Sequence, residues 1–187
     1  MADFDQIFSR AELIDAWRSG ARTKFIAFWG HTGRPDAVGP FVLSQWREAP
    51  FSLDGISYPT AEHYMMAEKA RLFGDEDTRQ EIISARDPGK AKALGRKIIA
   101  FDEAEWVRAR FDIVVAASLA KFGQTPMLRD YLLATTGKVL VEASPQDRIW
   151  GTDLARDDKA LADPEQWRGE NLLGFALMKA RAQMLRE

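Results

Sequence analysis

The residue types best suited to chemistry in this 187-residue sequence lie in the segment YPTAEHYMMAEKA, residues 58–70. In a helix of 3.6 residues per turn, positions 62, 65, 66 and 69 share a face, so Glu62 and Lys69 bracket two methionines. Their separation corresponds to a rise of roughly 10 Å along the axis, which is too far for an ion pair within the helix. Each charge therefore needs a partner on another element.

Two interpretations of this helix face follow from the spacing. In the first, both charges are structural, because a carboxylate in a first turn is favoured by the helix dipole and a lysine can lay its aliphatic stem over a core. In the second, Glu62 and Lys69 are partly desolvated groups beside a pocket, with pKa values tuned for acid, base or nucleophile work. The spacing by itself leaves both open.

A second set of candidates follows a predicted strand in LVEASPQDRIWG, residues 140–151. Asp147 and Trp150 fall in the loop after this strand, which is where functional residues commonly lie. Asp147 can organise an Asx turn while Trp150 fills the core. Alternatively, the two form an acid beside an aromatic platform that stacks a base.

Aromatic and basic side chains elsewhere can complete such a site. Trp29 and Trp46 also fall near loop or strand edges, and stacking of a base on an aromatic side chain contributes about 1 to 3 kcal/mol. A basic cluster surrounds the helix start at Asp87-Pro88. Such a cluster is usually a solvated face, but the helix N-terminus could hold a phosphate. The cluster consists of Arg86, Lys90, Lys92, Arg96 and Lys97.

Composition and spacing exclude several classes of site. The chain has no cysteine, which removes disulfides, thiolate catalysis and thiolate metal sites. His31 and His63 are the only histidines and lack paired-ligand spacing, so no metal is expected. The glycines match neither a phosphate-binding loop nor a dinucleotide fingerprint, and no cofactor is expected. A net charge of -2 provides no global basic field for nonspecific nucleic-acid binding.

The sequence also bears on cellular location. Acids and bases are mixed in the first twenty residues, which is unlike a signal peptide, and no stretch of eighteen uncharged apolar residues occurs. We therefore expect a protein that is neither exported nor membrane-spanning, with the cytoplasm as the default compartment.

The elements that must position the candidate residues are mostly helices. Thr60 is a predicted N-cap for a helix over 61–73 that Gly74 ends, and Asp54-Gly55 predicts a type I′ hairpin over 51–58. The length and the pattern predict one domain of the α+β class, a mostly helical body around a small sheet. Further helices are predicted after Ser9, from Asp87-Pro88, over 102–122, from Pro126 to near Gly137 and over 171–186, with strands in KFIAFWG and KVLVEAS.

Six segments taken together resemble the NADAR family, also called the YbiA-like family. They are FWG, GPFVLSQW, APFSLDGISYPTAEHYMMAEKARLFGD, DPGKAKALGR, LVEASPQDRIWG and GENLLGFALMKAR. The match runs in order from about residue 25 to the C-terminus. The resemblance therefore implies an N-terminal helical extension over 1–24 and a NADAR, or YbiA-like, N-glycosidase domain over 25–187.

The resemblance implies a hydrolase, an N-glycosidase that cleaves the bond between ribose C1′ and nitrogen. In one branch of the family the substrates are phosphorylated intermediates of riboflavin synthesis such as 5-amino-6-ribosylaminouracil 5′-phosphate, and a small phosphorylated ribosyl substrate of this kind is expected here. In another branch the substrate is ADP-ribose attached to guanine in nucleic acid. A non-catalytic module that binds ADP-ribose or NAD is a further alternative.

Carried over onto this sequence, the resemblance implies Glu62, Lys69 and Asp147 as the catalytic residues. A carboxylate such as Glu62 can stabilise an oxocarbenium-like sugar or activate water against it. A neutral Lys69 could instead displace the base as a Schiff base that water later resolves. The tryptophans are expected against the ring and an arginine at the phosphate; the residues expected to bind substrate are Trp29, Gly30, Trp46, Tyr64, Arg96, Trp150 and Asn171.

The sequence departs from the family pattern beside the expected pocket. Gln45 stands where asparagine is common, Arg47 and Glu48 replace a more aromatic, proline-bearing pair, and Asp153 occupies a position that is often glycine. These positions bear on which substrate the pocket accepts.

Overall fold

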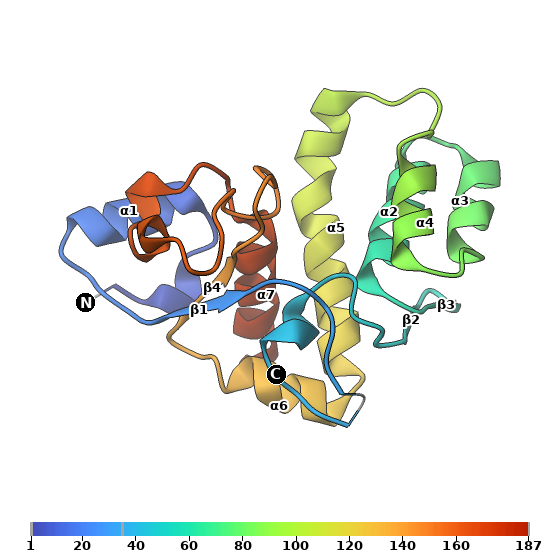
Figure 1. Cartoon of the computed structure of the whole chain (residues 1–187). Coiled ribbons are helices and arrows are strands. Elements are labelled where there is room, and N and C mark those ends of the chain that lie inside the picture. The colour runs from blue at the N-terminus through green and yellow to red at the C-terminus, as the bar shows by residue number, and fades with distance from the viewer. Residues whose placement is uncertain (1, 35, 187) are drawn as a thin grey trace.

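A long helix, α5 (Glu103–Gly123), runs through the middle of the computed structural model, which describes residues 2–34 and 36–186 (Figure 1). Three helices lie on one side of it, and the opposite side carries a C-terminal helix, two strands and an N-terminal helix. The first group is α2 (Ala61–Leu72), α3 (Glu76–Ile83) and α4 (Pro88–Gly95). The second is α7 (Leu172–Met184), β1 (Phe25–Phe28), β4 (Val139–Glu142) and α1 (Arg10–Arg18).

The remaining elements are short. Helix α6 (Pro126–Leu133) follows α5 and lies at the lower end of the molecule in Figure 1. The described residues also form short 3₁₀ helices. One, η1 (Phe4–Gln6), precedes α1, and the others lie in connections: η2 (Pro40–Leu43), η3 (Lys159–Ala162) and η4 (Pro164–Gln166). The α+β class expected from the sequence is confirmed, and no helix of the described residues is long and apolar enough to cross a bilayer.

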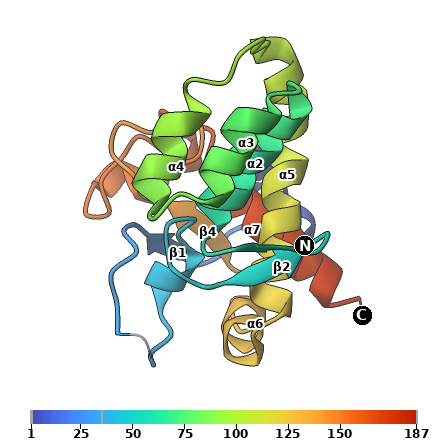
Figure 2. The same ribbon diagram turned by 90° about the vertical axis from the view of Figure 1, so that its right-hand side faces the viewer.

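The strands form two separate sheets where the sequence predicts one small sheet. Strands β2 (Phe51–Leu53) and β3 (Ile56–Tyr58) form the predicted antiparallel hairpin, which lies beneath helices α2 to α4 (Figure 2). Strand β1 instead pairs in parallel with β4, and Phe28 lies opposite Glu142. This pairing joins segments more than one hundred residues apart, so no local pattern could have predicted it.

Local signals at the start of α2 are confirmed. Asp54 and Gly55 have φ angles of 50° and 77°, as a type I′ turn requires. The Thr60 side chain accepts a hydrogen bond from the His63 amide at the N-terminus of α2, and Gly74 follows the helix with φ 70°. The hairpin and cap together fix where α2 begins, and therefore which of its side chains face inward.

Two sequence predictions on helices were incomplete. Helix α3 was not predicted, because its sequence EDTRQEII is mostly polar and only Ile82 is buried. Helix α6 ends at Leu133 and does not reach Gly137. The Leu132 and Leu133 carbonyls then accept hydrogen bonds from both the side chains and the amides of Thr135 and Thr136, so a tight turn replaces the last helical turn.

The N-terminal segment is tied to the body by a buried ion pair. Arg181 of α7 is fully buried, and its guanidinium lies 2.7 Å from the Asp5 carboxylate. The same guanidinium donates to the carbonyls of Thr135 and Lys138, while Asp5 also accepts from the Gly137 amide. The pair thus joins the start of the chain to the last helix and to the turn before β4.

Replacing Asp5 by alanine should destabilise the protein, because a buried guanidinium would lose its counter-charge. Breaking a buried pair in this way typically costs about 3 kcal/mol in free energy of unfolding. Urea unfolding of Asp5→Ala beside Asp15→Ala, an exposed acid of α1, measures the difference. Equal unfolding midpoints for the two variants would contradict a structural role for the pair.

Candidate active site

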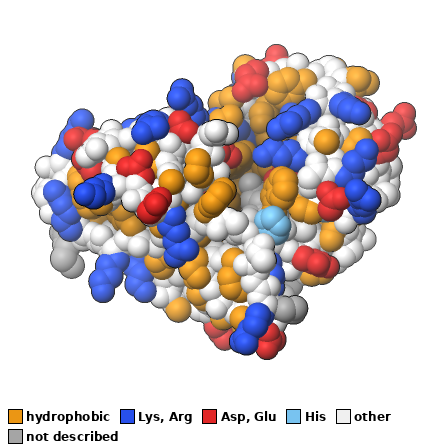
Figure 3. All heavy atoms as spheres, viewed as in Figure 1, with side chains coloured by type: hydrophobic (Ala, Val, Ile, Leu, Met, Phe, Trp, Pro, Cys, Tyr) orange, Lys and Arg blue, Asp and Glu red, His pale blue; other side chains and the backbone are white. Residues whose placement is uncertain are grey.

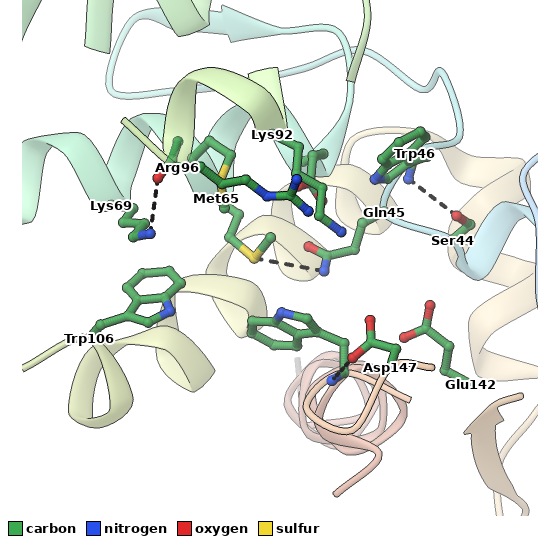
Figure 4. A pocket seen from close by; sticks show the side chains of 14 residues that line it. Ser44, Gln45, Trp46, Met65, Lys69, Lys92, Arg96, Trp106, Glu142 and Asp147 are labelled. Atoms are coloured by element: carbon green, nitrogen blue, oxygen red, sulfur yellow. Dashed lines mark hydrogen bonds between the residues drawn. The ribbon is translucent and has the colours of Figure 1, made fainter. Parts of the chain in front are cut away.

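A cavity of about 180 Å³ lies between the side of the molecule that carries α2 and α4 and the side that carries β4. The surface is hollowed between these two sides, with basic side chains gathered along one rim (Figure 3). Figure 4 shows Lys69 and Trp106 at one side of the cavity and Glu142 and Asp147 at the other, with Gln45 and Met65 between them. The cavity therefore has a basic and aromatic end and an acidic end.

Helix α2 contributes one face to this cavity. Glu62, Met65, Met66 and Lys69 all line it, as their helical spacing predicts. The structure thus supports the second interpretation of this face, in which the two charges border a pocket.

Glu62 is a carboxylate with little solvent around it. Its side chain is 2% exposed, and its Oε1 atom has no hydrogen-bond partner. Burial raises the pKa of Glu62 to about 7, while the charge of Lys92 and a hydrogen bond from the Trp46 side chain oppose the increase. A carboxyl group with this pKa exchanges a proton readily at neutral pH.

Lys69 is held at the other end of the α2 face. Its Nζ atom donates to the Gly95 carbonyl at 3.0 Å and lies 4.2 Å from the Phe101 ring centre and 5.5 Å from that of Trp106. Burial lowers the pKa of Lys69, and the charge of Glu103 counteracts this. Aromatic faces favour a cation, so these contacts suit a charged ammonium.

The structure shows the Asx turn that the sequence allows for Asp147. Its Oδ1 atom accepts from the amides of Ile149 and Trp150 at 3.0 and 2.8 Å, which is the Asx turn. Asp147 and Trp150 also line the cavity, so the turn aims both side chains at it.

A second cavity, of about 330 Å³, adjoins the first. Five residues line both: Ser44, Trp46, Lys92, Glu142 and Asp147. Trp29 and Gly30 line only the second, and the Trp29 side chain is 60% exposed. We call the first the inner cavity and the second the outer cavity.

The structure places two of the expected substrate-binding residues outside both cavities. Tyr64 follows Glu62 by two positions, about 200° around the helix, and its ring packs against Phe51 and Tyr58 of the hairpin. Asn171 is fully buried, and its side chain accepts from the Glu142 amide at 2.8 Å and donates to the Leu140 carbonyl at 2.9 Å. Tyr64 is therefore a core residue, and Asn171 holds β4 in place.

The structure also brings to the site an acid that the sequence patterns do not single out. Glu142, the last residue of β4, lines both cavities, and its buried Oε2 atom has no partner. Burial raises the pKa of Glu142 to about 8, and the charges of Asp147 and Glu62 add to this. Its signal in the sequence was weak but present: it is the one charged residue in an otherwise apolar strand, VLVE.

Other residues of the inner cavity were also missed as site residues. Trp106 lines it, and so does Lys92, which the sequence places in the basic cluster around Asp87-Pro88. Gln45 lines it as well, with its Oε1 atom buried and unpaired. Their positions depend on how α4, α5 and the segment after η2 pack against α2, which the sequence pattern does not reveal.

Two buried basic residues hold the walls of the site. Lys121 of α5 donates to the carbonyls of Val42 and Ser44 at 2.6 and 2.8 Å, which fixes the segment that carries Trp46. Burial lowers the pKa of Lys121 to about 7. The His63 ring nitrogens lie 2.8 Å from Thr60 Oγ1 and 3.1 Å from the Ala85 carbonyl, joining the start of α2 to the turn before α4.

Within the described residues, no group of three or more histidine and acidic side chains is arranged to hold a metal ion. The acids of the inner cavity face lysine, arginine and indole groups. The side chains that line the cavity supply carboxyl groups, amines and aromatic surfaces.

Comparison with known proteins identifies the family to which the chain belongs. The NADAR domain matches residues 27–185. The chain belongs to the NADAR family. N-glycosidase R617 of Acanthamoeba polyphaga mimivirus is 39% identical over 165 residues, covering 86% of this chain and 96% of that protein. N-glycosidase YbiA of Escherichia coli strain K12 is 34% identical over 149 residues, covering 80% and 83%.

A solved structure of a NADAR relative supports the same assignment. The NMR structure of the E. coli protein YbiA aligns with a TM-score of 0.70 and 31% identity, covering 87% of this chain and 86% of that one. A further relative, the chloroplastic riboflavin biosynthesis protein PYRR of Zea mays, is 34% identical over 139 residues, which are 71% of this chain and 20% of the maize protein. The chain is thus a NADAR enzyme, a hydrolase of N-glycosyl bonds.

The two hydrogen bonds from the Asn171 side chain to the backbone of β4 are expected to stabilise the fold. Asn171→Ala leaves the Glu142 amide and the Leu140 carbonyl unpaired, and each orphaned buried group costs about 1 to 3 kcal/mol. The free energy of unfolding should fall by about 3 kcal/mol in a chemical denaturation experiment. Gln183→Ala in α7 is the matched control. If Asn171→Ala lowers the free energy of unfolding by no more than this control does, the two hydrogen bonds do not stabilise β4.

Proposed function

We propose that the protein hydrolyses the bond between ribose C1′ and nitrogen in a phosphorylated ribosyl amine, such as 5-amino-6-ribosylaminouracil 5′-phosphate. The observation that carries the proposal is the division of one pocket into an acidic end and a basic end. Glu62, Glu142 and Asp147 form the first, with Lys92 close enough to act on both glutamates. Lys69 lies at the second, and the Arg96 guanidinium extends from that side toward the middle of the cavity (Figure 4). A substrate with a phosphate at one end and a developing sugar cation at the other matches this division.

The acidic end is suited to cleavage of the glycosidic bond. Positive charge builds on the sugar as the C1′–N bond breaks, and a nearby carboxylate stabilises it. Glu62 in its ionised form would act on C1′ and would accept a proton from the attacking water. Asp147, at the same end, contributes further negative charge.

The basic end is suited to the phosphate. Arg96 is exposed at the cavity and can offer a planar set of donors to phosphate oxygens. Lys69, with its ammonium held by Gly95 and two aromatic rings, adds a second positive charge. Trp46 and Trp150 also line this cavity and offer aromatic surfaces against which the sugar can pack.

The names of the relatives support a substrate of this class. Two of them are called N-glycosidases, and the maize relative is called a riboflavin biosynthesis protein. The maize match covers a fifth of that protein, so it supports the riboflavin intermediate less strongly than the glycosidase activity.

A second candidate substrate is ADP-ribose attached to guanine in nucleic acid. The observation in its favour is the outer cavity, which continues past Trp46 to the exposed Trp29 and Gly30. This additional space suits a substrate that is larger than a mononucleotide.

Release of the sugar tests both substrates. Mass spectrometry should detect ribose 5-phosphate from 5-amino-6-ribosylaminouracil 5′-phosphate. An ADP-ribosylated guanosine oligonucleotide is incubated in parallel, and ADP-ribose from it alone would replace the first substrate with the second. Binding without any product would favour a non-catalytic ADP-ribose or NAD module.

Borohydride in the same assay would trap a covalent adduct if Lys69 forms a Schiff base.

Glu62→Gln should reduce kcat about 100-fold or more, because the amide cannot accept the proton. In the wild-type protein, kcat should fall as the pH drops through about 7, where Glu62 becomes protonated. This acid limb should be absent from Glu62→Gln. The matched control is Glu68→Gln on the same helix, whose carboxylate pairs with Arg71 away from the cavity.

The same variant has a stability readout that needs no substrate. Because burial raises the pKa of Glu62, the folded state holds its proton more tightly than the unfolded state, and stability falls as the pH rises from about 4.5 to about 7. Glu62→Gln should therefore melt at a higher temperature than wild type above pH 7, with a smaller difference under acidic conditions. If Glu62→Gln keeps the wild-type kcat and melts at the wild-type temperature at every pH, Glu62 has no role in catalysis.

A further inference from the structure

We propose that Glu142 is the proton donor to the leaving nitrogen, acting at the junction of the two cavities, and that the base released from ribose occupies the outer cavity beside Trp29. The proposal rests on the proposed N-glycosidase function and assigns a role within that site.

Each cavity holds a different part of the substrate. Lys69, Arg96 and Glu62 line only the inner cavity, so the phosphate and the ribose belong there. At about 180 Å³ the inner cavity is smaller than the 300 to 1,000 Å³ that is usual for small-molecule sites, so part of the substrate must extend beyond it. The outer cavity is the adjoining space, and its exposed Trp29 offers a face for a planar base.

The bond to be broken therefore lies where the cavities meet. Glu142 and Asp147 are the acids that line both. In Figure 4 their carboxyl groups lie near one another at this side of the cavity. A group that protonates the leaving nitrogen must reach the base side of the bond, and Glu62, which lines only the inner cavity, is placed on the sugar side.

Of the two acids at the junction, Glu142 is the one free to donate. One oxygen of Asp147 already accepts two backbone amides, a bonding pattern that suits a carboxylate holding its loop. Glu142 Oε2 is buried without a partner. The backbone around Glu142 is fixed, because its amide donates to Asn171 and its carbonyl accepts from the Thr152 amide at 2.9 Å.

The charges around Glu142 favour its neutral form. Glu62 from α2 and Asp147 from the loop after β4 both raise its pKa, and Lys92 from α4 opposes them. Burial is the largest cause, and the pKa of Glu142 lies at about 8 against about 7 for Glu62. Burial and the two neighbouring acids therefore favour the protonated form of Glu142, which is the form that a proton donor needs.

The step balances in protons and electrons. The C1′–N electron pair goes to nitrogen, which takes the proton of Glu142, and the oxygen of one water molecule bonds to C1′. Glu62 takes a proton from that water. The products are ribose 5-phosphate and the free amine, with Glu142 ionised and Glu62 protonated. Exchange of one proton through solvent restores the starting state.

The test compares Glu142→Gln with wild type across neutral and alkaline pH, with ribose 5-phosphate release as the measurement. In wild type, kcat should fall as the pH rises through about 8, because the proton donor is lost. In Glu142→Gln, kcat should drop about 100-fold with little change in KM, and the alkaline limb should disappear. Glu81→Gln, an exposed acid of α3, is the matched control.

Two further measurements keep the outcome decisive if Glu142→Gln folds poorly. Glu142→Asp retains a carboxylic acid, so a lower kcat with the alkaline limb still present is expected. Infrared difference spectra at neutral pH, wild type against either variant, should reveal the carbonyl band of a protonated carboxyl group that belongs to Glu142. Absence of that band would overturn the proposal without any turnover assay.

The failures of the two proposals are distinguishable. A wild-type protein that releases no sugar from any of the substrates overturns the proposed function and this assignment together. An active wild type with Glu142→Gln at the wild-type rate, or with a reduced rate but an unmoved alkaline limb, overturns the role of Glu142 alone.

Discussion

The arrangement around the pocket depends on one constraint, which is the placement of several acidic groups where little water reaches them. A carboxylate in such surroundings must find a cation or hold a proton. The charge of Asp147 raises the pKa of both Glu62 and Glu142, and Lys92 is the cation that acts on both. The result is a pair of acids whose pKa values are both raised toward neutral pH, where a carboxyl group can donate or accept a proton.

Buried polar side chains hold the walls that impose this constraint. Lys121 binds the backbone before Trp46, and Asn171 binds two backbone groups of β4. His63 joins α2 to the turn before α4. In each case the side chain bonds to backbone groups of a segment that carries pocket residues. Such bonds are costly to break because the groups left behind are buried, so they favour one arrangement of the site.

The acids of the pocket are held at some cost to stability. Glu62 ionised in a buried position lowers the stability of the folded state, as its raised pKa implies. The core that offsets this cost lies where α5, α7 and β4 meet, and the strand residues Val139, Leu140 and Val141 are fully buried there. The same strand ends in Glu142, so the rigid part of the core carries an acid of the site directly.

The sequence by itself determined the local structure and one wall of the site. The Asp54-Gly55 turn, the Thr60 cap and the helical spacing placed Glu62, Met65, Met66 and Lys69 on one face, because these signals act between residues that are close in the chain. The motifs of the NADAR family pointed to Asp147 and Trp150, which line the same cavity.

Only the tertiary structure decided which groups oppose that wall. The parallel pairing of β1 with β4 and the packing of α4 and α5 against α2 bring Glu142, Lys92 and Trp106 to the pocket and leave Tyr64 in the core. A sequence pattern reports periodicity within one element. Burial and the charges contributed by other elements set the pKa of a carboxyl group, and they exist only once the chain is folded.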